Sequence, residues 1–295
     1  MNRLPPVSRV GIVAKHRLRE AAPHLADISA WLRQRGLQAV FETATAGLCA
    51  LPCDWPVREK EGLVREVDMV LVLGGDGTLL GMADRIAEAG VSIPILGINF
   101  GSLGFLTEVT LPELYPSLEA AVTGRASVEE RLMLRSTTTR GASPPITHLG
   151  LNDVVITKTA SRLIDLSVWV EEEFLTRVKG DGLIIATPTG STAYNLAAGG
   201  PIVEPSVNAL VITPIAPHTL TNRPIVVPSA SSIRVQPLIE ERDEVYVTFD
   251  GQAGYRLQSG DQIGVREAGT RLRLIRPSTR SYFEVLREKL KWGER

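Results

Sequence analysis

Residues 69–88 constrain the fold more than any other stretch. Five consecutive apolar residues, 69–73, predict a strand buried on both faces. The glycines of the Gly-Gly-Asp-Gly-Thr sequence at 74–78 then surround one carboxylate, Asp76, and the apolar positions from 79 to 86 have helical spacing. A strand that enters a glycine-rich turn and then a helix presents backbone N–H groups and the helix dipole to an anion.

Asp76 is an unexpected residue in a turn that favours anions. It suits such a turn if it holds a cation or accepts a proton from a substrate hydroxyl. The alternative is that Asp76-Gly77 only makes a turn. Residues 74–78 by themselves leave both interpretations open.

The first third of the chain predicts a parallel α/β sheet. Apolar segments at 10–14, 38–42, 69–73 and 93–98 alternate with helical patterns at 18–35 and 79–89. Ligands of such sheets bind beyond the carboxyl ends of the strands, where the glycine turn lies. Residues 99–107 follow another strand at this edge, and they are either a plain loop or part of the site.

The chain changes character after a helical segment at 111–124. Alternating strand patterns then predominate, and Asp250-Gly251 is a hairpin signal. We therefore expect an α/β domain with a Rossmann-like parallel sheet at 1–108 and a β-rich domain at 109–275. The helix within 276–295 is expected to pack back on the first domain.

Bulk composition excludes several classes of protein. The 295 residues carry a net charge of −1, which predicts no bulk attraction to nucleic acid or to an anionic membrane. The uncharged stretch 91–107 is broken by Pro94 and three glycines, and the N-terminus lacks an apolar signal core, so a cytoplasmic enzyme is expected. Cys49 and Cys53 have no further Cys or His close in sequence, which argues against a zinc site.

Residues 179–201 form a second group of polar and small side chains. Five glycines bracket Asp181, four hydroxyl residues and a Tyr-Asn pair, a composition that suits a flat polar ligand. Asp181 can contact a ribose hydroxyl, an exocyclic amine or an amide. The alternative is a turn capped by Ser or Thr that leads into a short helix at 192–198. Upstream, Asn152-Asp153 precedes a strand and could be a simple Asx turn.

In this order, these motifs resemble the NAD kinase family over nearly the whole chain. The turn at 74–78 is only moderately specific, since it also occurs in diacylglycerol and sphingosine kinases, and phosphofructokinases have a related turn. The block at 181–201 is more specific, together with Asn152-Asp153 and the segments 222–225 and 250–252. The resemblance implies a phosphofructokinase/diacylglycerol-kinase-like first domain. It also implies transfer of a phosphoryl group from ATP, or from inorganic polyphosphate, to the 2′-hydroxyl of the adenosine ribose of NAD, which gives NADP.

The resemblance assigns Asp76 as the group that accepts the hydroxyl proton. It implies NAD contacts at Asp76, Gly77, Asn152, Asp153, Arg162, Lys179, Asp181, Thr192, Ala193, Tyr194, Asn195, Leu196, Ala197 and Gln252. A contact at His218 is implied more weakly. It implies a phosphate-donor loop made of Gly74, Gly75, Gly77 and Thr78. A divalent cation, with Mg²⁺ favoured, and a homodimer or homotetramer are also implied, but no metal-ligating residue is identified.

Three positions differ from the commonest family pattern. Asp153 stands where Glu is usual, Lys179 where Arg is frequent, and Asn195 where Ser is frequent. Lysine cannot make the planar bidentate contact of arginine, so the preference between NAD and NADH stays open. Two other functions also stay open at this point: a lipid kinase that shares the glycine turn, and a dinucleotide sensor that binds without catalysis.

Overall fold

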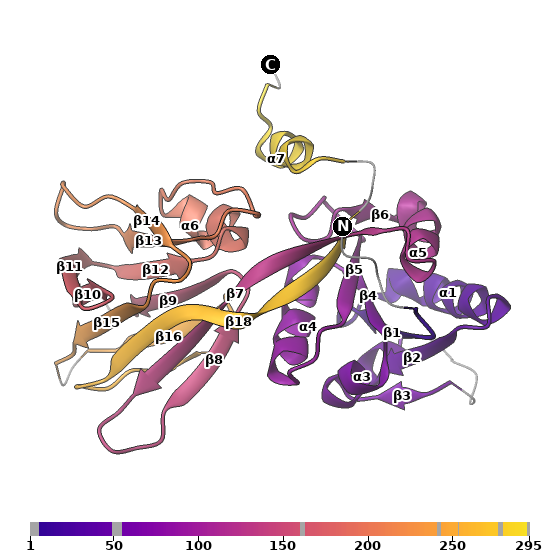
Figure 1. Ribbon diagram of the computed structural model, residues 1–295, viewed down its shortest axis with the longest axis horizontal. Helices are drawn as coiled ribbons and strands as arrows, with labels where there is room; N and C mark the ends of the chain where they lie inside the picture. Colours follow the sequence, from indigo (N-terminus) through magenta and orange to yellow (C-terminus); the bar gives the residue numbers. More distant parts are fainter. Residues whose placement is uncertain are drawn as a thin grey trace. The chain divides into compact units, whose positions relative to one another are not determined.

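The computed structural model describes residues 6–48, 55–159, 163–240, 243–252, 254–276 and 280–293. The chain divides into two compact units (Figure 1). One comprises Met1–Glu130 with Leu272–Arg295, and the other comprises Arg131–Arg271. Two long strands, β7 (Ser127–Thr139) and β18 (Gln262–Arg276), contain the points at which the chain passes between the units.

The first unit is built on the parallel sheet that the sequence predicted. Its strands run in the order β5-β4-β1-β2-β3, and every neighbouring pair is parallel. The strands are β1 (Arg9–Ala14), β2 (Gln38–Glu42), β3 (Val57–Arg58), β4 (Met69–Gly74), β5 (Pro94–Asn99) and β6 (Val109–Thr110). The helices are α1 (Ala22–Gln34), α2 (Thr43–Ala46), α3 (Lys60–Glu66), α4 (Asp76–Glu88), α5 (Leu114–Val122) and α7 (Tyr282–Leu290), with short 3-10 turns at Arg19–Ala21 and Leu111–Glu113.

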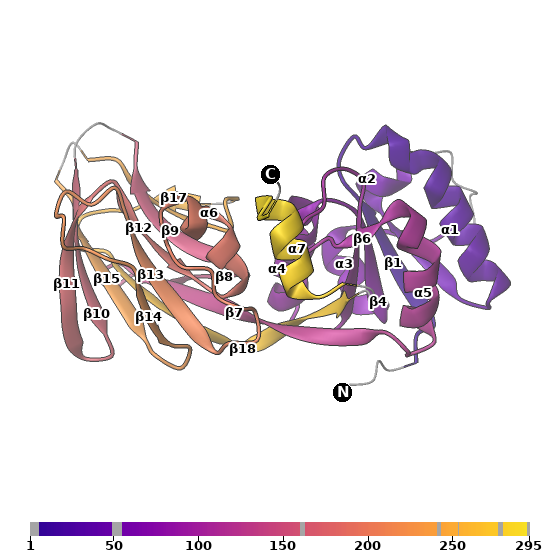
Figure 2. The same cartoon turned by 90° about the horizontal axis from the view of Figure 1, so that it is seen from above.

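Helices cover both faces of this sheet, which is why β4 and β5 are buried along their whole length (Figure 2). The buried side chains of α1 and α5 share a core with alternate residues of β1, β4 and β5. On the other face, Gly11 of β1 leaves room for Leu63 of α3, because an added Cβ would lie 2.6 Å from its Cδ2. The loops that follow the strands at their carboxyl ends therefore start from a rigid base.

Residues 109–130 belong to the first unit, although we expected them in the second domain. The physical reason is a contact that spacing cannot reveal. Strand β6 pairs in parallel with β5, with Val109 opposite Ile98. Leu114 and Leu118 of α5 are buried in the core of the same sheet. Helix α7 also belongs to this unit, and Val285 and Leu286 are its buried residues.

The second unit is a β-sandwich of antiparallel strands. One described sheet has the order β14-β13-β12-β9-β16-β17, and β10, β11, β15 and β18 pair in another layer. The strands not yet defined are β8 (Ile146–Gly150), β9 (Asp153–Lys158), β10 (Ile164–Val170), β11 (Glu173–Gly180), β12 (Gly182–Ala186), β13 (Ala209–Ile215), β14 (Ile225–Pro228), β15 (Ile233–Leu238), β16 (Val245–Phe249) and β17 (Gly254–Arg256). Apolar side chains of both layers form one core, which confirms the predicted β-rich region.

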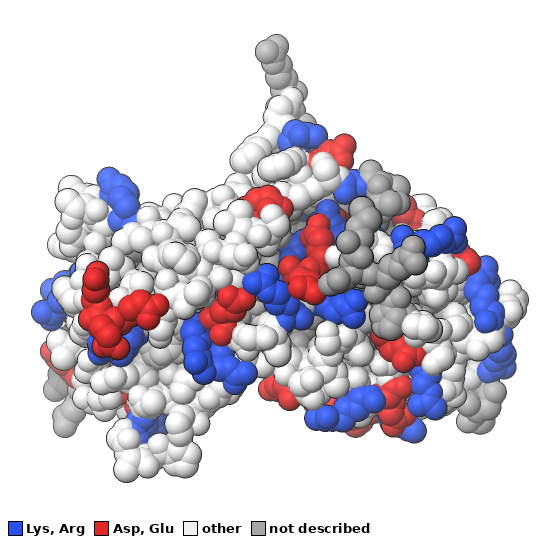
Figure 3. Space-filling model, viewed as in Figure 1, with Lys and Arg blue, Asp and Glu red and all other residues white. Residues whose placement is uncertain are grey.

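The predicted hairpin at Asp250-Gly251 is confirmed. It joins β16 to β17, and the φ angles of Asp250 (53°) and Gly251 (65°) are both positive, as a type I′ turn requires. Among the described residues, no helix is long and apolar enough to cross a membrane. On the face drawn in Figure 3, acidic and basic side chains are interspersed.

Candidate functional site

Strand β4 leads through the glycine turn directly into helix α4, as predicted. Gly75 occupies the N-cap position in an extended conformation, and Asp76 is the first helical residue. Gly74 is needed for close packing, because an added Cβ would lie 2.9 Å from Thr78 Oγ1 and 3.0 Å from Lys15 Cβ. The turn therefore fixes the position of Asp76 at the carboxyl end of the sheet.

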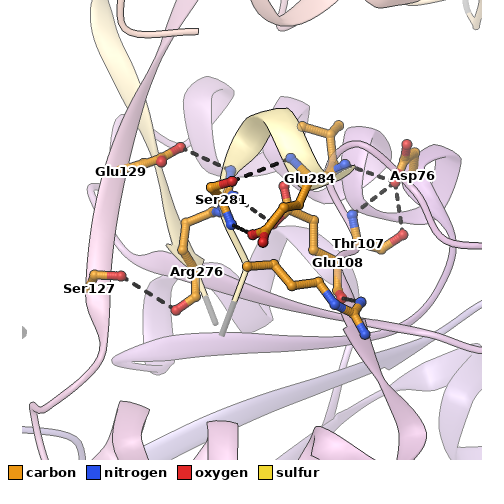
Figure 4. Close-up of polar contacts among 10 residues, drawn as sticks. Asp76, Thr107, Glu108, Ser127, Glu129, Arg276, Ser281 and Glu284 are labelled. Carbon is orange, nitrogen blue, oxygen red and sulfur yellow. Dashed lines mark hydrogen bonds and ion pairs between the residues drawn. The ribbon is translucent and has the colours of Figure 1, made fainter. Parts of the chain in front are cut away.

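The carboxylate of Asp76 is held by four hydrogen-bond donors from one short stretch (Figure 4). Its Oδ2 accepts the N–H of Phe105 at 2.8 Å. Its Oδ1 accepts the N–H groups of Leu106 (3.1 Å) and Thr107 (2.9 Å) and the hydroxyl of Thr107 (2.8 Å). Oδ2 thus takes one of these hydrogen bonds and Oδ1 takes three, so Oδ2 has the greater capacity to accept a further proton donor.

The sequence left open whether residues 99–107 are a plain loop or part of the site. In the structure this stretch holds the Asp76 carboxylate in one orientation. A Cβ at Gly104 would lie 2.0 Å from Asp76 Oδ1, so only glycine fits beside this carboxylate. The Asn99 side chain is hydrogen-bonded within residues 99–107 and stabilises their conformation. Its Nδ2 donates to the carbonyl of Ser102 at 2.8 Å and to Thr107 Oγ1 at 3.1 Å, and its Oδ1 accepts the N–H of Gly101 at 2.6 Å.

A cavity of about 310 Å³ opens at the carboxyl ends of β1, β4 and β5. Its lining includes Gly74 and Gly75 of the turn, Asn99, and the side chains of Lys15 and Glu20. Lys15 follows the last residue of β1 and is exposed. We did not identify it from the sequence, although its place directly after the first predicted strand was an available signal.

In the second unit, Asp250 holds the segment that contains Asn152-Asp153. Its Oδ2 accepts the N–H of Leu151 at 2.7 Å, and its Oδ1 accepts those of Asn152 (2.7 Å) and Asp153 (3.0 Å). Burial raises the pKa of Asp250, and these three hydrogen bonds oppose the rise. From the sequence we assigned Asp250 to a hairpin turn and to a family segment, and we did not predict its hydrogen bonds to residues 151–153.

Asp153 is almost completely buried, with 3% of its surface exposed. Burial, and secondly the charge of Asp250, raises the pKa of Asp153 to about 7. Two carboxyl groups that share a dry environment cannot both ionise easily, and Asp250 is the one held by backbone N–H groups. The ribose contact of Asp153 implied by the family resemblance stays a prediction.

The block at 181–201 meets the Asn152-Asp153 segment within the second unit. The Thr187 hydroxyl donates to the carbonyl of Leu151 at 2.6 Å, and its N–H donates to the carbonyl of Asn152 at 2.9 Å. A Cβ at Gly190 would lie 2.1 Å from that same Asn152 oxygen. Two motifs for which the family resemblance implies dinucleotide contacts therefore lie side by side.

Several residues of this block face inward. A 3-10 turn, Thr189–Thr192, leads into the short helix α6 (Tyr194–Ala197). Asn195 has no exposed surface. Its Nδ2 donates to the carbonyls of Ser191 (2.9 Å) and Pro201 (3.0 Å), and its Oδ1 accepts the hydroxyl of Thr213 at 2.6 Å. The Asn195 side chain thus stabilises the turn, and its predicted NAD contact is not tested by this geometry.

Other predicted residues are more accessible. Tyr194 is 45% exposed, Thr192, Ala193 and Leu196 are partly buried, and Ala197, Lys179, His218 and Gln252 are exposed. The N–H of His218 donates to the carbonyl of Lys179 at 2.8 Å, which brings these two residues together. Arg162, Cys49 and Cys53 lie outside the described residues.

Asp181 has a basic partner that we did not identify from the sequence. Lys158 Nζ lies 3.4 Å from Asp181 Oδ1; the lysine side chain is 7% exposed and the carboxylate side chain 51%. The hydroxyl of Thr157 donates to the carbonyl of Asp181 at 3.2 Å. Asp181 therefore presents a fixed, half-exposed carboxylate, as a contact to a ribose or an amide would need.

Comparisons with known proteins match both units. A family model described as the ATP-NAD kinase N-terminal domain matches residues 10–126, and one described as the ATP-NAD kinase C-terminal domain matches 151–277. The NAD kinase of Geobacter sulfurreducens is 50% identical over 91% of this chain and 93% of its own length. That of Syntrophotalea carbinolica is 46% identical over 98% of this chain and 100% of its own length.

Solved structures agree with these matches. Yeast NADH kinase, in complex with NADH, superposes with a TM-score of 0.88 at 26% identity, over 98% of this chain and 89% of the yeast chain. The Archaeoglobus fulgidus NAD kinase, in complex with ATP, gives a TM-score of 0.75 at 26% identity, over 95% and 99% of the two chains. By fold, by both family models and by these relatives, the chain belongs to the NAD kinase family.

Proposed function

We propose that this enzyme phosphorylates the 2′-hydroxyl of the adenosine ribose of NAD, with ATP as donor, to give NADP. A bond forms between the ribose oxygen and the γ-phosphorus, and the bond from that phosphorus to the β–γ bridging oxygen breaks. The electron pair of the broken bond leaves with ADP, and the hydroxyl proton passes to a base on the enzyme. The relatives named NAD kinase support the substrate pair.

The observation that carries the proposal is the clamped carboxylate of Asp76. A general base must be held in one orientation and must keep an acceptor site for the substrate proton. The N–H groups of Phe105, Leu106 and Thr107 fix the orientation. Oδ2, which accepts one of these hydrogen bonds, then receives the proton of the ribose hydroxyl. A non-catalytic sensor would have no use for this arrangement.

The cavity beside the glycine turn is proposed as the binding site of the donor phosphates. Gly74, Gly75, Gly77 and Thr78 form the turn, and no atom lies within 4 Å of a Cβ placed at Gly75 or Gly77, so a phosphate could approach this backbone closely. Lys15 lies over the turn and lines the same cavity. Its ammonium group is proposed to bind a donor phosphate oxygen as a point charge.

A divalent cation is proposed to arrive with the donor as the magnesium complex of ATP. Among the described residues, no group of three or more His, Cys, Asp and Glu side chains could hold a metal ion. Mg²⁺ commonly binds through substrate phosphates and water with one or two protein carboxylates, so a cation that enters with ATP needs no such group.

The NAD side of the site is proposed to lie on the second unit. Hydrogen bonds join Thr187 to the carbonyls of Leu151 and Asn152. The side chains accessible on the same unit are Lys179, Asp181, Tyr194 and Gln252. Use of NADH or polyphosphate, a homo-oligomeric state and a cytoplasmic location also stay proposals. Because the yeast relative is an NADH kinase in complex with NADH, NADH is the first alternative acceptor to assay.

The test is an assay of NADP formation with wild-type enzyme and Asp76→Asn, using ATP or polyphosphate against NAD or NADH. Asparagine keeps one acceptor oxygen for the hydrogen bonds of residues 105–107 but cannot take the proton. We expect kcat to fall by about 10²- to 10⁴-fold, while the Kd of NAD measured by calorimetry changes little. Near-normal turnover of Asp76→Asn would refute the base role. Phosphorylation of diacylglycerol with no reaction of NAD would instead support a lipid kinase.

A further inference from the structure

A buried ion pair lies next to the stretch that clamps Asp76 (Figure 4). Arg276, the last residue of β18, is 6% exposed, and its Nη2 lies 2.7 Å from Oε2 of Glu108, which is 2% exposed. Its Nη1 also lies 3.4 Å from Oε2 of the more exposed Glu129. A buried ion pair is weak evidence for stability, because desolvation of the two charges offsets much of their attraction. Its position in the fold is therefore informative.

Glu108 directly follows the three residues whose N–H groups bind Asp76. Residues 105–108 are thus fixed twice, by Asp76 through the backbone and by Arg276 through the Glu108 carboxylate. Residue 108 is covalently bonded to Thr107, so a shift of residue 108 would disturb the neighbouring N–H groups that bind Asp76. The ion pair lies one residue away from the groups that orient the catalytic carboxylate.

Two more cationic side chains from the C-terminal part of the chain, Arg280 and Lys289, contact residues 105–108. Arg280 Nη1 donates to the carbonyl of Glu108 at 3.2 Å. Lys289 Nζ, on α7, lies 5.7 Å from the centre of the Phe105 ring, within the range of a cation–π contact. The start of α7 is fixed by a capping box in which Ser281 and Glu284 bond reciprocally, so helix α7 begins at a defined residue.

We propose that Arg276, Arg280 and Lys289 hold residues 105–108 in place, and that Arg276 positions the Asp76 carboxylate through Glu108. The inference rests on the proposed role of Asp76 as the base. Arg276 touches neither substrate nor reacting atoms, so it is a positioning residue. It acts on kcat, because displacement of a catalytic group by about 1 Å can cost roughly 10²-fold in rate.

The experiment compares Arg276→Gln, Arg276→Lys and the double variant Arg276→Gln/Asp76→Asn in the full-length enzyme. We expect Arg276→Gln to lower kcat by about 10- to 100-fold, with the KM values of NAD and ATP within about threefold of wild type. Arg276→Lys keeps the charge and should recover part of the loss. Because Arg276 acts only through Asp76, the double variant should be no slower than Asp76→Asn alone.

The matched control is Arg140→Gln in the second unit. Arg140 Nη2 lies 2.7 Å from Oδ2 of the fully buried Asp261, so this variant removes a comparable ion pair. It should lower the melting temperature and leave kcat unchanged. If Arg276→Gln does not fold, Arg280→Ala removes the hydrogen bond to the Glu108 carbonyl from a more exposed position, and a smaller fall in kcat is expected.

Two outcomes separate this inference from the proposed function. Turnover that survives in Asp76→Asn refutes the base role and this inference with it. An inactive Asp76→Asn together with wild-type kcat in a folded Arg276→Gln refutes the positioning role alone. Losses in kcat that multiply in the double variant also refute it, since Arg276 would then act independently of Asp76.

Discussion

Substitution of Gly104 by alanine perturbs the Asp76 clamp without replacing any residue that carries charge or donates a side-chain hydrogen bond. The added Cβ would lie 2.0 Å from Asp76 Oδ1 and 2.4 Å from Thr107 Oγ1. Neither atom is the free end of a flexible chain, because the two are hydrogen-bonded to each other and Oδ1 also accepts the N–H groups of residues 106 and 107. The carboxylate, the loop or both must move.

The size of the movement follows from ordinary contact distances. An added carbon atom settles no closer than about 3.4 Å to its neighbours, so the carboxylate and Gly104 must separate by more than about 1 Å. A displacement of about 1 Å at a catalytic group costs roughly 10²-fold in kcat. The loss cannot exceed that of Asp76→Asn, about 10²- to 10⁴-fold, since removal of the base is the limiting case. Overpacking should also lower the free energy of unfolding by about 1–3 kcal/mol.

The assay is steady-state NADP formation at saturating ATP and NAD, beside thermal unfolding of the same samples. Gly62→Ala is the matched control. Gly62 lies in helix α3, and a Cβ there would meet nothing closer than 3.9 Å, so activity should be unchanged and stability equal or slightly higher. Wild-type kcat in Gly104→Ala would show that the Asp76 clamp is not needed for catalysis.

Three further predictions concern single side chains. Lys15→Met should raise the KM of ATP about 10- to 100-fold, which is the affinity lost with one charge-assisted hydrogen bond, and leave the KM of NAD unchanged. Equal effects on both KM values would contradict the proposal that Lys15 binds the donor phosphates. Asp153 has a folded-state pKa of about 7, raised from 3.8, so its contribution to stability is fully present below about pH 4 and is lost as the pH rises towards 7. In guanidinium unfolding, Asp153→Asn should therefore be more stable than wild type at pH 8, by up to about 4 kcal/mol. It should also lose less stability than wild type between pH 5 and 8. Parallel plots of unfolding free energy against pH for the two proteins would refute this. Asn195→Ala should lower the free energy of unfolding by about 3 kcal/mol, because it strands the buried polar partners of the amide; loss of NAD binding at unchanged stability would instead support a direct ligand contact.

Local sequence patterns predicted the elements that carry the site. The apolar run at 69–73, the glycines after it and the helical spacing beyond are contiguous, so β4, the turn and α4 could be read in order. The same holds for the hairpin at Asp250-Gly251, because the two central residues of a type I′ turn need positive φ angles. Motif order then indicated the family, which the comparisons confirm.

Contacts between distant residues decided the rest. The sequence presents Asp76 as an acid in an anion-binding turn, and only the fold brings it to the N–H groups of residues 105–107, about thirty positions away. Asp250 lies about a hundred positions from the backbone groups that it binds at 151–153. Neither pairing leaves a periodic trace, because a backbone N–H group is the same in every residue except proline.

The sequence by itself determined which residues could do the chemistry: one carboxylate in a glycine turn, a polar block rich in hydroxyl groups, and a parallel sheet whose edge brings loops together. The tertiary structure decided which of them are free to act. It turned Asn195 inward to satisfy buried carbonyls and buried Asp153 near the charge of Asp250. It also gave Asp76 four hydrogen-bond donors on a stretch whose next residue, Glu108, forms an ion pair with Arg276. The physical reason is that composition fixes the chemical groups present, whereas burial and hydrogen bonding across the fold fix their orientation and proton affinity.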